Sequence, residues 1–291
     1  MEREKITKSG RLLEADFFPV WSDGRRIPPH PPIKKLSSEA QQKYNHQQAI
    51  KRAVRIVNAN FSSGDIFMHP TYFQDMAPQT EAEATRDINN YFRRVKTKRA
   101  AELKQTEILL AERPNDKKLL KKREKLLQPF KYYYSLEQVT YKTGIRKGKI
   151  NWHFHIFMTG GIERDTLEDM WPKGMRANAD RFQPERFGAE AAARYISKDT
   201  QGRRRLRGSK NLEKPKTKTK DGRITARGVE RLAKQRIDDR AYWENRYKGY
   251  RFVRCFSRFN NYNGHWYVSV VMYKPEKDGD LPGWEVEDWI T

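Results

Sequence analysis

Two histidines separated by one residue are the part of this chain best suited to chemistry. His153 and His155 alternate with apolar residues in the run NWHFHIFM, residues 151–158. Successive side chains of a β-strand point to opposite faces, so both imidazoles would lie on one face, about 7 Å apart from twice the rise per residue. Two imidazoles at that separation can bind one metal ion, although a lone His-x-His is more often a pair of solvated side chains.

The histidine run needs a neighbouring strand, and residues 130–142 (FKYYYSLEQVTYK) have the aromatic and β-branched composition of one. Residues 143–148 contain two glycines and would form the turn of an antiparallel hairpin. With that turn centred on Ile145, Glu137 lies directly opposite His153 and shares its face. A carboxylate at this position would complete a site of two histidines and one carboxylate.

A tyrosine and a lysine three residues apart form a second candidate for chemistry. Tyr195 and Lys198 fall in residues 185–199, which have the composition of a helix. Residues three apart share a helical face, so the ammonium group could act on the phenol. The alternative is a packed aromatic side chain followed by a solvated cation.

The charge of the chain predicts a polyanionic partner. Lys and Arg number 60 against 37 Asp and Glu, which gives a net charge of +23. Nucleic acid is the first expectation and an anionic membrane the second. The cations are densest just after the tyrosine helix. We expect phosphate contacts from Arg194 within that helix and from Arg203, Arg204, Arg205, Arg207 and Lys210 after it.

Cysteine content and hydropathy restrict the class of protein. The single cysteine, Cys255, excludes an intrachain disulfide framework and a cysteine zinc cluster. No apolar run approaches the ~20 residues of a membrane span, and no secretory signal precedes the first charges. A cytoplasmic protein without a membrane partner is therefore expected.

The pattern of elements divides the chain into three segments. Residues 1–58 would contain a strand, a Pro-rich basic arm and a helix, and residues 59–215 would form the central domain. Within that domain, residues 99–128 are expected to be an inserted helical hairpin, because paired leucines flank Pro114-Asn115-Asp116. Residues 216–291 would add a basic helix and a β-hairpin around Asn263-Gly264.

Taken together, these motifs resemble the HUH endonuclease superfamily, in particular its single-tyrosine rolling-circle replication initiators from plasmids, phages and integrative elements. His153-Phe154-His155 matches the His-hydrophobic-His metal motif, and Tyr195-Ile196-Ser197-Lys198 matches the Tyr-x-x-Lys motif. The first motif of the family corresponds to Asp65–Tyr72, where only Thr71 and Tyr72 fit, so the resemblance assigns no role to His69. The resemblance covers roughly residues 60–215.

The resemblance implies an α+β fold, with an antiparallel sheet that has helices on one face and a metal site on the other. Tyr195 would attack a scissile phosphodiester to give a 5′-phosphotyrosine, with Lys198 lowering the pKa of the phenol or contacting the phosphate. His153, His155 and Glu137 would hold Mn²⁺ or Mg²⁺, and imidazole ligands favour Mn²⁺. The substrate would be single-stranded or melted origin DNA. Since the chain has no phosphate-binding loop of a helicase, host helicase and polymerase are expected partners.

Two other functional classes fit the same residues. A conjugative relaxase or a single-strand transposase would use the same chemistry, and a non-catalytic nucleic-acid-binding protein would have the same charge. A labelled oligonucleotide with Mn²⁺ distinguishes the last of these, because a binder cuts no strand.

Overall fold

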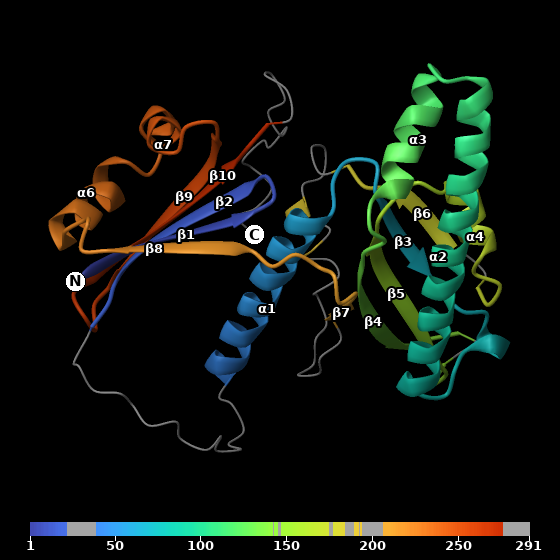
Figure 1. Ribbon diagram of the computed structural model, residues 1–291. Helices are drawn as coiled ribbons and strands as arrows, with labels where there is room; N and C mark the ends of the chain where they lie inside the picture. Colours follow the sequence, from blue (N-terminus) through green and yellow to red (C-terminus); the bar gives the residue numbers. More distant parts are fainter. Residues whose placement is uncertain are drawn as a thin grey trace. The chain divides into compact units, whose positions relative to one another are not determined.

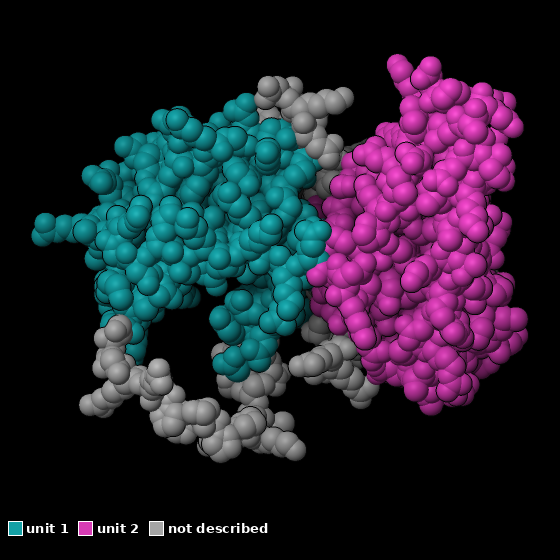
Figure 2. All heavy atoms as spheres, viewed as in Figure 1, with its two compact units in different colours: residues 1–59, 213–291 teal, residues 60–212 magenta. Residues whose placement is uncertain are grey.

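A computed structural model describes residues 1–21, 39–141, 143–144, 147–174, 177–183, 189–191, 193 and 206–275. The chain forms two compact units (Figure 2). Unit 1 combines residues 1–59 with residues 213–291, and unit 2 comprises residues 60–212. The two flanking segments, which the sequence pattern presents as separate extensions, therefore belong to one unit.

Unit 2 is built on a five-stranded sheet with the strand order β6-β3-β5-β4-β7, and each neighbouring pair is antiparallel (Figure 1). The strands are β3 (Ile66–Pro70), β4 (Tyr132–Thr140), β5 (Ile150–Met158), β6 (Ala177–Arg181) and β7 (Leu206–Gly208). The histidine run is therefore the central strand, β5. The expected hairpin of β4 and β5 is confirmed by the ladder of nine residue pairs between them.

Helices cover the apolar face of this sheet, as the resemblance implied. The long helix α2 (Glu81–Glu112) begins with a capping box between Thr80 and Glu83. Its buried stripe packs with the alternate apolar residues of β5 and with the short helix α4 (Arg164–Asp169). The stripe and its partners on β5 are Ile88, Tyr91, Phe92 and Val95 with Trp152, Phe154, Ile156 and Met158.

The inserted hairpin is present, but it is not a separate helical unit. Its first helix is the continuation of α2, and its second is α3 (Lys117–Leu127). The side chain of Asp116 accepts hydrogen bonds from two backbone N–H groups of the first turn of α3 and caps it. Arg99, on α2, binds backbone carbonyls at the end of α3 and after β5, and so fixes the hairpin to the sheet.

A proline ends strand β3, which lies in the interior of the sheet. Pro70 is the last residue of β3, and the ladder with β5 stops at Met68 because proline has no N–H to donate. Pairing resumes only as an isolated bridge between Thr71 and His153.

Unit 1 is a second α+β layer structure with the strand order β8-β1-β2-β10-β9. Its strands are β1 (Glu2–Ser9), β2 (Leu12–Pro19), β8 (Lys216–Asp221), β9 (Arg251–Asn260) and β10 (His265–Tyr273). Helices α6 (Ala226–Gln235) and α7 (Arg240–Arg246) bury Val229, Leu232 and Trp243 against one face. Helix α1 (Glu39–Asn60) forms ion pairs with Glu14 and Asp16, which lie on β2.

The α+β fold class is thus observed in both units. Within the described ranges, no helix is both long and apolar enough to cross a membrane.

Candidate metal and phosphate site

The register of the central hairpin brings the predicted metal ligands together. Glu137 on β4 is the direct partner of His153 on β5, as the centring of the turn on Ile145 predicted. Glu137 Oε2 lies 3.2 Å from Nε2 of His155, whose direct partner is Ser135. The two histidines and the carboxylate therefore share the sheet face opposite α2.

A third histidine joins this group, although the sequence motifs assigned it no role. His69, the residue before Pro70 on β3, has its Nδ1 2.6 Å from Nδ1 of His155. One of these Nδ1 atoms donates the hydrogen bond and the other accepts it. The two rings therefore cannot both carry a proton on Nδ1. The signal was present in the sequence, because the alternation of β3 puts His69 on the same face as Phe67. Phe67 in turn stacks on Phe157, a residue of the histidine face.

Burial keeps the three imidazoles neutral. Desolvation is the main cause for each ring, and the neighbouring His155 adds to it at His69, where the pKa falls to about 4. The pKa values of His153 and His155 are also lowered by burial, although the nearby carboxylate of Glu137 opposes the shift. A neutral imidazole has a lone pair to offer, which is the form that a metal ligand needs.

One buried hydroxyl group on this face has no partner within the described residues. Ser135 is 4% exposed, and its Oγ makes no hydrogen bond. A buried polar atom without a partner costs free energy, so such atoms in native proteins usually serve a ligand, a water molecule or an ion. Ser135 lies between Tyr133 and Glu137 on β4, directly opposite His155.

The side chains of the site are of types that bind a divalent cation. Their positions, however, are not those of ligands around a metal ion. Neutral imidazoles with one carboxylate match the preferences of Mn²⁺ and, less closely, Mg²⁺. In the part of the chain that is described, no group of three or more His, Cys, Asp or Glu side chains is placed to hold an ion. His155 Nε2 and Glu137 instead face each other directly, so an ion would have to separate them.

The predicted nucleophile lies outside the described residues. Tyr195, Lys198 and Arg194 fall there, as do Arg203, Arg204 and Arg205. Of the expected helix, the described residues at 189–191 and 193 are helical, and Ala189 and Ala193 are buried.

The structure does not bring Arg207 to the histidine face. Arg207 is the partner of Tyr134 on β4 and forms an ion pair with Glu81 and a 2.6 Å hydrogen bond with Thr85, both on α2. It therefore lies on the helix-covered side of the sheet. Lys210 is exposed in the turn after β7.

No family model, curated protein or solved structure matches this chain.

Proposed function

We propose that this protein is a metal-dependent DNA-nicking and strand-joining enzyme that initiates rolling-circle replication. The observation that carries the proposal is that His153, His155 and Glu137 share one face of a five-stranded antiparallel sheet whose other face is covered by helices. The Tyr-x-x-Lys sequence and the net charge of +23 support it.

His153, His155 and Glu137 would hold the ion, and His69 would position His155. A Mn²⁺ or Mg²⁺ ion bound there supplies Lewis-acid stabilisation of the charge that develops on the phosphodiester. His69 contacts Nδ1 of His155 and so fixes the ring with Nε2 directed at Glu137. Contacts of this kind to the second ring nitrogen orient metal-binding histidines in general.

Tyr195 would be the nucleophile in the proposed reaction. Its phenolic oxygen forms a bond to phosphorus, the bond from phosphorus to the 3′ oxygen breaks, and the 3′ oxygen leaves as a hydroxyl after taking up a proton. The DNA is then held as a 5′-phosphotyrosine. Because a phosphodiester is exchanged for a phosphodiester, the attack of a 3′-hydroxyl can reverse the step and join the strand. The ordinary phenol pKa of ~10 is the reason that Lys198 is needed beside it.

The proposal includes cytoplasmic partners. The chain has no Gly-x-x-x-x-Gly-Lys-Ser/Thr loop, so strand separation would come from a host helicase and synthesis from a host polymerase. Origin DNA, single-stranded or melted, would be the substrate.

Labelled single strands tiled across the DNA that flanks the gene test the proposal. With Mn²⁺, the wild-type protein should cut one strand and, after denaturation, carry the new 5′ end on the peptide that contains Tyr195. Tyr195→Phe should lose both cleavage and joining, while Tyr262→Phe should lose neither, because Tyr262 is 99% exposed in a turn of unit 1. A free 5′-phosphate without any adduct would indicate hydrolysis by water and contradict the proposal, and binding without cleavage would indicate a non-catalytic protein.

A further inference from the structure

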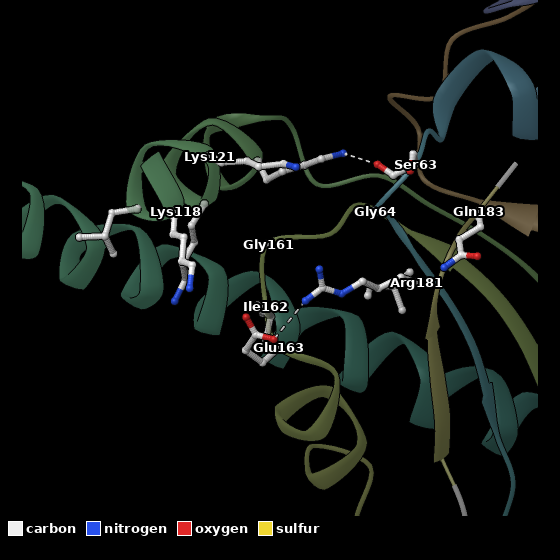
Figure 3. Close-up of a pocket in the computed structure, with 13 residues that line it drawn as sticks. Ser63, Gly64, Lys118, Lys121, Gly161, Ile162, Glu163, Arg181 and Gln183 are labelled. Atoms are coloured by element: carbon white, nitrogen blue, oxygen red, sulfur yellow. Dashed lines mark hydrogen bonds and ion pairs between the residues drawn. The ribbon is translucent and has the colours of Figure 1, made fainter. Parts of the chain in front are cut away.

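A basic groove lies between helix α3 and the edge of the sheet of unit 2, and none of the catalytic residues above lines it. It has a volume of about 610 Å³. Lysines of α3 form one wall, and Arg181 and Gln183, at the end of β6, form the opposite wall (Figure 3). Between them lie Gly64 and the segment 161–163, which follows β5.

The cations of this groove exceed its anions. Three of them have acidic partners, since Lys122 pairs with Glu102, Lys125 with Asp65 and Arg181 with Glu163. The last pair is weak, because its side chains are 61% and 71% exposed. Lys118 and Lys121 are exposed, and neither has an ion pair with another described residue.

The spacing of the lysines suits a linear polyanion better than a single small anion. Lys118, Lys121 and Lys125 follow one another by three and four residues, so they form a row along one face of α3. The row rises about 10 Å along the helix axis, at 1.5 Å per residue. Successive phosphates of one DNA strand advance about 3.4 Å along the axis of a duplex, so at that spacing the row extends over about three phosphate-to-phosphate steps.

The groove is held open by contacts that fix α3 to the sheet. Arg99 binds the carbonyl groups of Lys125, Leu126 and Gln128 at the end of α3, and on the other side those of Thr159 and Gly160. These contacts fix the backbone of α3, so the helix itself need not be ordered when a ligand binds.

Close packing behind the groove also requires glycine. A Cβ atom on Gly160 would lie 2.5 Å from the carbonyl oxygen of Gly64, so no larger residue fits there. The segments that lie between the two walls are thus closely packed against each other.

From these contacts we infer that the groove binds the phosphodiester backbone of a nucleic-acid strand outside the site of cleavage. The groove lies at the start of β3, by Ile66, and His69 lies three residues further, about 10 Å along the strand. The side chains of Ile66 and of its partner Arg181 are on the helix-covered side of the sheet, opposite the histidines. Groove and histidine site can therefore hold different segments of one strand. The identity of the polymer rests on the proposed function, whereas the anion site rests on the groove alone.

The test compares two double variants that each remove two positive charges. Lys118→Gln with Lys121→Gln changes the groove, and Lys104→Gln with Lys117→Gln changes two exposed lysines of the same hairpin that do not line it. Binding to a fluorescein-labelled 30-nucleotide oligo(dT) strand is followed by anisotropy in EDTA at several salt concentrations. Without metal no strand is cut, so a protein that fails to nick DNA still gives a result here.

The groove variant should flatten the slope of log K against log salt by about 1.4, at about 0.7 for each phosphate that is no longer neutralised, and weaken binding about 25-fold at 0.1 M salt. The control variant should keep the wild-type slope, and Lys118→Arg with Lys121→Arg should restore it. An unchanged slope in the groove variant, or equal flattening in both Gln variants, would overturn the inference. So would complete displacement of the strand by equimolar inorganic phosphate, because that result would define a site for a small anion.

Discussion

Removing the guanidinium group of Arg99 should loosen the helical hairpin from the sheet. Arg99 is 4% exposed and binds five backbone carbonyl groups. Burial lowers its pKa, and the nearby carboxylate of Asp65 opposes that shift. Arg99→Met keeps most of the side-chain volume but leaves the acceptors unpaired.

The expected loss of stability is about 3 kcal/mol or more. The hydrogen bonds to Thr159, Gly160 and Leu126 are buried, and each buried acceptor without a partner costs about 1–3 kcal/mol. Lys125 and Gln128 offer carbonyl groups that are only partly buried, so water can replace the hydrogen bonds there. The variant no longer buries a cation, and this gain in free energy offsets part of the cost of the three buried acceptors. We therefore expect a total near the lower end, at about 1 kcal/mol for each acceptor.

Hydrogen exchange read by mass spectrometry measures this loss where it should occur. Peptides from α3 and from the end of β5 should exchange faster in Arg99→Met, by a factor of about 100 for 3 kcal/mol. Arg123→Met is the matched control, because Arg123 is 45% exposed and pairs with Glu107 only at 3.8 Å. Wild-type protection of α3 in Arg99→Met would refute the assignment of Arg99 as its anchor.

Three further predictions concern the two sites and unit 1. His153→Ala and His155→Ala should each abolish Mn²⁺-dependent cleavage, while oligonucleotide affinity in EDTA stays within about threefold of wild type. Cleavage by either variant at the wild-type rate would remove the metal site from the mechanism. Replacement of Arg203, Arg204 and Arg205 by Gln should flatten the slope of log K for DNA binding against log salt by about 2. Arg207→Gln should leave this slope unchanged, because Arg207 is paired with Glu81. A flatter slope in Arg207→Gln would show that Arg207 contacts phosphate. In unit 1, burial tends to raise the pKa of Glu4, but the hydrogen bond from Tyr247 and the charges of Arg246 and Lys220 outweigh it and the pKa is lowered. The resulting stability is present above the ordinary carboxyl pKa of 4.5 and is lost as the pH falls through the lower folded value, so the difference in unfolding free energy between wild type and Glu4→Gln should shrink below pH 4.5 and stay constant above it.

The central hairpin could be predicted from the sequence because its signals are local. Alternation in residues 151–158 gives the two faces, and the turn between Gly144 and Gly148 gives the register that places Glu137 opposite His153. Both glycines have positive φ, 74° and 81°, a conformation that other residues rarely adopt. The capping box at Thr80 is equally local, and it marks the start of α2.

The sheet of unit 1 could not be predicted, because most of its strand partners are far apart in the chain. Its local elements could be, since the expected strand and helix of residues 1–58 and the hairpin around Asn263-Gly264 are observed as β2, α1 and the β9–β10 pair. Strand β1 pairs with β8, more than 200 residues later, and β2 pairs with β10. The sequence of β1, EREKITKS, looks like a solvated segment, since it has a single large apolar residue. Its buried Glu4 accepts hydrogen bonds from Arg246 and Tyr247 of the C-terminal segment. Oε1 of its buried Glu2 lies 2.9 Å from Nδ1 of His265, while Oε2 of Glu2 has no partner among the described residues. Only a tertiary structure that brings those donors together makes the burial of such a strand tolerable.

The contact made by His69 in the candidate site could not be predicted from the sequence either. The sequence places it on a strand interrupted by Pro70, and a proline normally excludes a regular ladder. In the structure the ladder stops at Met68, yet the backbone stays close enough to β5 for the bridge from Thr71 to His153. The gap in the ladder is spanned by the two imidazoles, whose Nδ1 atoms are 2.6 Å apart. The proline that weakens the sequence signal therefore lies where a side-chain contact replaces a backbone one, and that contact holds His155 in the orientation that faces Glu137.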